Sequence, residues 1–112
     1  MNTKIIAEIG SSHAGSLHRA TDLIHAAANA GVDICKFQLF AADTLWRKDD
    51  PRHEAVIPLS LPEEWLPELN RTCESRNVEF LCTPFSPQAV DVLENLGVKR
   101  YKVASGDLTY LP

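Results

Sequence analysis

Short segments rich in β-branched and aromatic residues alternate along this chain with longer amphipathic segments. Four stretches have the length and composition of strands, at residues 4–9, 34–40, 79–83 and 100–104. Three stretches between them have helical periodicity, at residues 17–30, 60–76 and 87–96. Each helical segment passes to the next strand through Gly31, Asn77 or Gly97, residue types that accept a left-handed backbone at a helix end. This weak internal repeat predicts an α/β fold with parallel strands and right-handed crossovers.

The expected helix boundaries carry recognisable start signals. Ser16 and Ser86 are placed to cap the first and third helices, and Pro87 suits the first helical position of the third. The second helix is expected to begin with the capping-box pattern of residues 60–63. Because proline removes a backbone donor, we expect a kink or a broken first turn at Pro67.

Size and charge exclude several classes of protein. The chain has 112 residues, with 11 basic and 15 acidic side chains and a net charge of −4. This length allows one domain at most, and residues 1–112 are treated as one unit. The chain has no cluster of basic residues, so binding to nucleic acid or to an anionic membrane is not expected. No apolar run approaches the roughly 20 residues of a membrane helix, and the first residues do not resemble a signal peptide, so a cytoplasmic protein is expected.

The three cysteines are predicted to be reduced core thiols. They are odd in number, lie in apolar segments and lack the spacing of metal ligands.

Polar residues inside the strands distinguish an open sheet from part of a barrel. Strands of an open parallel sheet are buried on both faces and read as continuous apolar runs. Here Lys36 and Gln38 alternate with apolar neighbours, and Glu8 and Lys102 interrupt two other strands. This period of two predicts the first half of a TIM-type (β/α)8 barrel, in the order βαβαβαβ, whose polar interior opens into a site. A buried Glu8–Lys36 ion pair without a functional role is the alternative for that pair.

Each expected strand ends in a polar or turn-forming cluster. Lys36 and Lys102 offer point charges, Thr83 and Ser105 offer hydroxyl donors, and neighbouring glycines let backbone amides approach a ligand. The sequence therefore predicts a pocket for a small polyanion at the carboxyl ends of the strands.

Five motifs, taken in their order along the chain, resemble the N-terminal half of the sialic acid (N-acetylneuraminate) synthase family. They are Ala7-Glu8-Ile9-Gly10, His13 with Gly15, Lys36-Phe37-Gln38, Cys82-Thr83-Pro84-Phe85 and Tyr101-Lys102-Val103-Ala104-Ser105-Gly106-Asp107. The resemblance implies a barrel enzyme that condenses phosphoenolpyruvate with N-acetylmannosamine or a related N-acyl amino sugar. The products are a nine-carbon 2-keto acid and phosphate, with cleavage of the C–O bond of phosphoenolpyruvate. It also implies a divalent metal, Mn²⁺ or Mg²⁺, and a homodimer at full length.

Site roles follow from the same resemblance. Lys36 and Lys102 are expected to bind the carboxylate and phosphate, Thr83 and Ser105 to hold phosphate oxygens, and Gln38 to line the pocket. Glu8 is expected to face the reacting centre. The last acidic residue of the fifth motif is usually Glu and is a candidate for handling the proton of the attacking water. Here it is Asp107, one methylene shorter, and proton transfer depends on placement within about an ångström.

The chain also departs from the family pattern. Ser12-His13-Ala14-Gly15 stands where Asn-His-Asn-Gly is common, which removes two amides and is expected to change sugar specificity. For His13 a structural role is favoured over metal ligation, because the metal-binding histidines of the family lie on later strands. No metal ligand is therefore assigned here, and the ligands are expected beyond residue 112. His18, His25 and His53 are expected on the surface.

A complete barrel takes about 250 residues. The first hypothesis is that these residues act within a longer synthase and are inactive alone. The alternative is a non-catalytic half-barrel that binds anions or has a structural role and closes by homodimerisation. A third reading is a related phosphoenolpyruvate-dependent aldol synthase that acts on a sugar phosphate.

Overall fold

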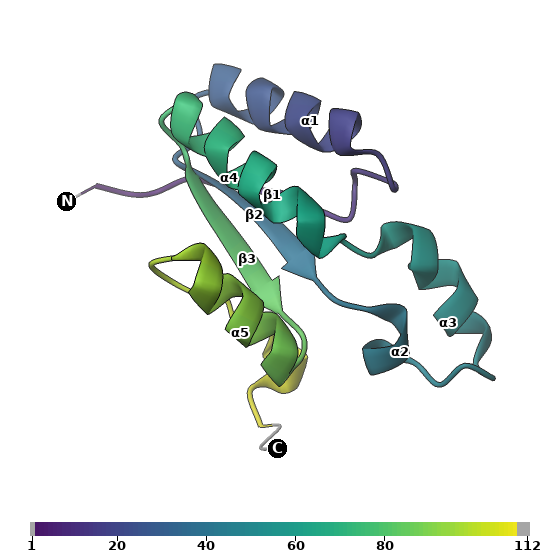
Figure 1. The fold of residues 1–112 in the computed structure, drawn as a ribbon. Helices are drawn as coiled ribbons and strands as arrows, with labels where there is room; N and C mark the ends of the chain where they lie inside the picture. The colour runs from purple at the N-terminus through teal and green to yellow at the C-terminus, as the bar shows by residue number, and fades with distance from the viewer. Residues whose placement is uncertain (1, 110–112) are drawn as a thin grey trace.

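The computed structural model describes residues 2–109 and contains a three-stranded parallel sheet. The strands β1 (Ile6–Gly10), β2 (Ile34–Leu39) and β3 (Glu79–Pro84) lie in sequence order. Three longer helices follow them, α1 (Leu17–Asn29), α4 (Leu66–Ser75) and α5 (Pro87–Leu96). Figure 1 shows α1 and α4 running back along the sheet between successive strands, and α5 following β3. The predicted α/β class with parallel strands is therefore confirmed.

All three long helices cover the same face of the sheet. Successive parallel strands in the order β1-β2-β3, joined by crossovers of one hand, require this arrangement. The strands contribute side chains at every second position to the core, including Cys35, Phe37 and Leu39 from β2. The helices contribute Ile24, Leu69 and Leu93, all fully buried, among others. The opposite face of the sheet, which we call the inner face, carries polar side chains toward the carboxyl ends of the strands, together with the apolar Ile6, Ile34 and Leu81.

Local chemistry fixes the ends of the helices. The Ser16 and Ser86 hydroxyls accept the backbone N–H of Arg19 and Ala89, each at 3.1 Å, as predicted for N-caps. Gly31 after α1, Asn77 after α4 and Gly97 after α5 have φ values of 89°, 57° and 87°, so all three predicted left-handed joints are confirmed.

The second predicted helix begins later than expected. Ser60 does not cap it, because the Ser60 hydroxyl donates to the carbonyl of Ile57 at 2.7 Å. Instead a 3₁₀ turn, η2 (Glu63–Trp65), precedes α4. Pro67 lies in the first turn of α4, where its missing N–H costs no intrahelical bond, so no kink is needed.

The connection from β2 to α4, in which no helix was predicted before residue 60, folds into short helices. These are α2 (Ala42–Leu45), α3 (Pro51–Val56) and the 3₁₀ turn η1 (Ile57–Leu59). Figure 1 shows α2 and α3 beyond the carboxyl end of β2. The segment therefore stands at the end of the sheet where the site was predicted.

The fourth predicted strand does not form. Residues 100–104 have no strand geometry, although the Lys102 N–H approaches the Cys82 carbonyl at 3.5 Å. An ion pair of 2.8 Å between Arg100 Nε and Glu79 Oε2 also holds this segment against β3. A parallel strand needs a regular ladder of hydrogen bonds, and among residues 2–109 this segment makes a single marginal one with β3. A further 3₁₀ turn, η3 (Ser105–Asp107), follows it.

The three cysteines of the chain lie in its core. Cys35, Cys73 and Cys82 are free and buried, as predicted. Burial raises the pKa of Cys82 to about 12, and the Cys35 thiol together with burial raises the pKa of Cys73. Within the described part of the chain, no helix has the length and apolarity needed to cross a membrane.

Candidate functional site

Glu8 and Lys36 lie opposite each other on the inner face. The strand register pairs Glu8 on β1 with Lys36 on β2, and paired residues of parallel strands point to the same side. Their side chains form an ion pair of 2.6 Å between Lys36 Nζ and Glu8 Oε2. The Lys36 side chain is 18% exposed and that of Glu8 is 50% exposed, so the pair remains open to solvent and to a ligand.

The next row toward the carboxyl ends of the strands contains Gln38 and Thr83. The register pairs these residues across β2 and β3, two positions beyond Lys36. Thr83 is buried and Gln38 is half-buried. Four of the predicted site residues, Glu8, Lys36, Gln38 and Thr83, therefore lie together on one face at one end of the sheet.

A bulge in β1 brings the chain close to this group. The register shifts between Glu8 and Gly10, and Gly10 has a φ of 54°. A Cβ at Gly10 would lie 3.0 Å from Glu8 Oε1 and 3.8 Å from Gln38 Oε1. Glycine is needed here both for the backbone conformation and for the space beside the two side chains.

Ser11 is a contact of the site that was not singled out from the sequence. Its hydroxyl donates to Gln38 Oε1 at 3.2 Å, joining the β1–α1 loop to β2. The signal available in the sequence was the position of Ser11, immediately after the Glu-Ile-Gly end of a strand.

Lys102 does not reach the ion pair of Glu8 and Lys36. Its N–H approaches the carbonyl of Cys82 at 3.5 Å, but residues 100–104 form no strand pairing with β3. The Lys102 ammonium bends back and donates to the Val103 carbonyl at 2.7 Å, and the residue is exposed.

Ser105 and Asp107 are not brought to the other site residues. Both belong to η3, and Ser105 is exposed. Asp107 lines a hollow of about 400 Å³ together with Phe85 and Val90. Neither side chain forms a hydrogen bond or an ion pair with Glu8, Lys36, Gln38 or Thr83 in the described structure.

The described residues do not by themselves form a three-ligand metal site. Within residues 2–109 no group of three or more His, Cys, Asp or Glu side chains is placed to hold a metal ion. Zinc sites take at least three protein ligands, whereas Mg²⁺ is commonly held by one or two carboxylates together with waters and substrate oxygens. We therefore derive no catalytic step through a metal from these residues.

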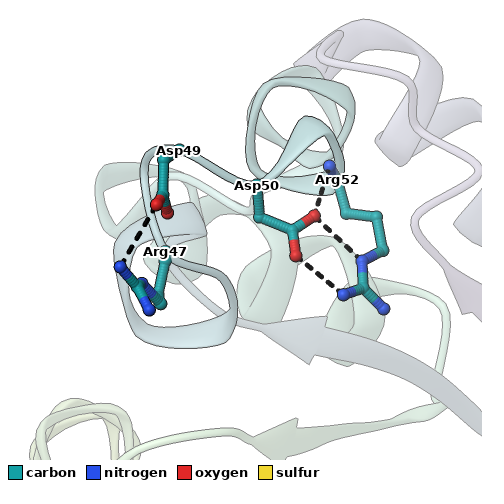
Figure 2. Close-up of polar contacts among 4 residues, drawn as sticks. All are labelled: Arg47, Asp49, Asp50 and Arg52. Carbon is teal, nitrogen blue, oxygen red and sulfur yellow. Dashed lines mark hydrogen bonds and ion pairs between the residues drawn. The ribbon is translucent and has the colours of Figure 1, made fainter.

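Ion pairs organise the segment around α2 and α3. The carboxylate of Asp50 caps α3 and accepts two hydrogen bonds from the Arg52 guanidinium, while Arg47 pairs with Asp49 (Figure 2). The Arg52 guanidinium also lies 3.7 Å from the centre of the Trp46 ring. The Arg52 side chain and backbone N–H lower the pKa of Asp50 to about 2. This network joins the turn between α2 and α3 to the first turn of α3.

The histidines differ in their surroundings. His18 and His25 are exposed, as expected. His53 is not a surface residue, because its side chain is only 13% exposed and its ring pairs with Asp43 between α3 and α2. His13 is fully buried in the β1–α1 loop, where it accepts a backbone hydrogen bond in the structural role favoured for it.

Comparison with known proteins places the chain in a family. A model of the NeuB family matches residues 23–112. The chain belongs to the NeuB family. NeuB-family relatives include the N,N'-diacetyllegionaminic acid synthase of Legionella pneumophila, 38% identical over 100% of this chain and 35% of the relative. The pseudaminic acid synthase of Helicobacter pylori is 30% identical over 96% of this chain and 36% of the relative. The chain thus spans about a third of the length of these curated relatives.

Solved structures give the same relationship. The N-acetylneuraminic acid (sialic acid) synthetase of Leptospira borgpetersenii superposes with a TM-score of 0.91 at 29% identity, covering 96% of this chain and 38% of that chain. The spore coat polysaccharide biosynthesis protein SpsE of Bacillus subtilis gives a TM-score of 0.74 at 38% identity, covering 91% of this chain and 29% of that chain. The resemblance to sialic acid synthases is therefore confirmed, and the fold is that of the N-terminal part of such a synthase barrel.

Proposed function

We propose that these residues form the phosphoenolpyruvate side of an enzyme that condenses phosphoenolpyruvate with an N-acyl amino sugar. The observation that carries the proposal is the group of Glu8, Lys36, Gln38 and Thr83 on the inner face, at the carboxyl ends of the strands. In barrel enzymes active sites are built at that end. The names of the relatives, synthases of legionaminic, pseudaminic and neuraminic acids, support the reaction class.

Lys36 is proposed to bind an anionic oxygen of phosphoenolpyruvate. One of its three ammonium donors is engaged by Glu8, which leaves two for a ligand. The side chain is mostly buried, so a carboxylate or phosphate there forms a charge-assisted bond with little competing water. The Leptospira relative was solved in complex with citrate, a small polyanion, which supports this ligand class.

The other residues have complementary proposed roles. Thr83 offers a hydroxyl and Gln38 an amide beside the same ligand, and Glu8 faces the reacting centre. Lys102 adds a second charge when its side chain turns from the Val103 carbonyl toward Thr83. The roles of Ser105 with phosphate oxygens and of Asp107 with the proton of the attacking water require η3 to approach Glu8.

The reaction is proposed to conserve atoms as follows. The C3 carbon of phosphoenolpyruvate attacks the aldehyde carbon of the sugar and forms the new C–C bond. Water adds at C2, and the C2–O bond to phosphate breaks. The products are a 2-keto acid and inorganic phosphate. A divalent metal and a homodimer are also proposed for the protein at its natural length.

Turnover tests the proposal directly. The protein at its natural length is incubated with phosphoenolpyruvate, MnCl₂ or MgCl₂ and a panel of N-acyl amino sugars, and both phosphate and 2-keto acid are measured. We expect equal amounts of both products with at least one amino sugar, and loss of both with EDTA. Phosphate release with arabinose 5-phosphate and with none of the amino sugars would replace the proposal by a sugar-phosphate synthase.

A further inference from the structure

His13 is fully buried in the loop between β1 and α1, although histidine is a polar residue. Its Nδ1 accepts the backbone N–H of Gly15 at 3.1 Å. Nδ1 therefore carries the lone pair, and the neutral ring holds its proton on Nε2. The imidazole serves this loop as a hydrogen-bond acceptor.

The loop around His13 has a backbone that needs such support. Gly10, Ala14 and Gly15 all have positive φ values, of 54°, 51° and 80°. Ala14 is the notable member, because residues with a Cβ rarely adopt this conformation. Two backbone bonds inside the loop, from Ala14 N to Ser11 O and from Ser16 N to His13 O, measure 3.1 Å and 3.0 Å. The acceptor on His13 adds the contact that holds Gly15 in place.

The connection between β2 and α4 closes over the same loop. The Trp65 ring, in η2, lies perpendicular to the His13 ring with 5.5 Å between centres. A Cβ at Gly15 would lie 3.2 Å from the Pro58 carbonyl oxygen in η1. His13 and Gly15 are thus packed against two turns of a segment that is distant in sequence.

The other end of the loop reaches the proposed substrate site. Ser11 accepts the Ala14 N–H through its carbonyl and donates through its hydroxyl to Gln38 Oε1 at 3.2 Å. Gln38 lies on the inner face with Lys36 and opposite Thr83. The contacts therefore link Trp65 to His13, His13 through the backbone of Ala14 and Gly15 to Ser11, and Ser11 to Gln38.

We propose that His13 is a positioning residue, whose Nδ1 acceptor holds the β1–α1 loop so that Ser11 orients the Gln38 amide toward phosphoenolpyruvate. The proposal rests on the proposed function in one respect, the identity of the ligand that Gln38 meets. His13 itself has no place for a ligand, because it is enclosed by the loop and Trp65.

Two substitutions separate the acceptor of His13 from its bulk. In His13→Asn the side-chain oxygen takes the place of Nδ1 and can accept the Gly15 N–H. In His13→Phe a ring remains against Trp65, and the acceptor is lost. His18→Asn, on the exposed face of α1, is the matched control.

Steady-state kinetics of the protein at its natural length give the first test. We expect His13→Phe to raise the KM for phosphoenolpyruvate at least tenfold, and His13→Asn and His18→Asn to stay within threefold of wild type. A His13→Phe enzyme with wild-type KM and kcat would overturn the proposal, since a purely structural role lowers only the folded fraction. If His13→Phe does not fold, His13→Gln, whose amide reaches the Nε2 position, replaces it with the same expectation.

A second readout does not depend on turnover. The side-chain amide of Gln38 is followed by ¹H–¹⁵N correlation spectroscopy in the ligand-free protein. We expect its resonances to shift in His13→Phe and to stay near the wild-type position in His13→Asn. Unmoved Gln38 resonances in His13→Phe would overturn the positioning role, whereas shifted resonances in a protein without turnover would overturn only the proposed reaction.

Discussion

Gly10 combines a left-handed backbone with a crowded position beside Glu8. We predict that Gly10→Ala lowers the free energy of unfolding by about 1–2 kcal/mol, the usual cost of this conformation for a residue with a Cβ. The new methyl group also displaces the Glu8 carboxylate and weakens phosphoenolpyruvate binding. Gly31→Ala is the control, because Gly31 also has a positive φ but has no atom within 4 Å of its Cβ position.

Urea unfolding measures the effect of Gly10→Ala on stability, and ligand titration measures its effect on phosphoenolpyruvate affinity. Both variants should lose stability, and only Gly10→Ala should lose affinity. Equal phosphoenolpyruvate affinity in Gly10→Ala and Gly31→Ala would contradict the placement of Glu8 at the ligand.

His13 predicts a pH dependence of stability. Burial lowers its pKa from the ordinary value of 6.5, and no charged side chain of the described structure forms an ion pair with it. A histidine with a lowered folded-state pKa contributes full stability above pH 6.5 and loses it as the pH falls toward the lowered pKa. In urea unfolding, the stability advantage of wild type over His13→Asn should therefore shrink between pH 6.5 and pH 5. A constant difference would show that His13 has the same pKa in the folded and unfolded protein, and would contradict the lowering of its pKa by burial.

At the scale of elements, the α2–α3 segment depends on the pair formed by Asp50 and Arg52. Since Arg52 lowers the pKa of Asp50 to about 2, Arg52→Gln should return that pKa toward the ordinary range for aspartate. Carboxyl ¹³C shifts measured during an acid titration report it, with Arg47→Gln as the control that leaves the Asp50 pair intact (Figure 2). An Asp50 pKa unchanged by Arg52→Gln would contradict the two-bond pair.

Sequence patterns predicted the elements that depend on local chemistry. The caps Ser16 and Ser86, the left-handed Asn77 and Gly97, and the alternation in β2 all involve neighbours close in the chain. Elements that depend on distant partners were missed or misplaced. The strand at residues 100–104 needs a regular ladder with its neighbours, and the start of α4 depends on how the preceding segment packs.

Some residues of the candidate site were also predictable from the sequence, and others were not. The inner-face positions of Glu8, Lys36, Gln38 and Thr83 follow from period-two alternation, which is readable in the sequence. The Ser11–Gln38 contact and the complete burial of His13 come from loop packing against Trp65 and Pro58, which no local pattern encodes. The Ser11–Gln38 contact and the burial of His13 could be identified only from the structure.

At the scale of the whole molecule, β1 and β3 each have a side without a strand partner in the described sheet. If residues 100–104 pair with β3 in the protein at its natural length, Lys102 joins the site opposite Thr83. We then predict that Lys102→Ala weakens phosphoenolpyruvate binding by about 2 kcal/mol, the contribution of a charge-assisted bond. Lys99→Ala, at an exposed residue immediately before that segment, is the control. Equal affinity in both variants would exclude Lys102 from the site.

The mass of the protein in its own cells, measured by native mass spectrometry, separates the two readings of the whole molecule. The synthase reading predicts a mass well above 12.4 kDa per chain. A homodimer of 12.4 kDa chains would instead support the half-barrel that closes on itself.

Calorimetric titration with phosphoenolpyruvate tests the central claim most directly. Wild type is compared with Lys36→Met, which removes the charge on the inner face, and with Lys4→Met, which removes an exposed charge before the amino end of β1. We predict that Lys36→Met raises Kd about 30-fold, equivalent to about 2 kcal/mol, and that Lys4→Met leaves it unchanged. Equal affinities in wild type and Lys36→Met, or no binding to wild type, would contradict a phosphoenolpyruvate site on the inner face.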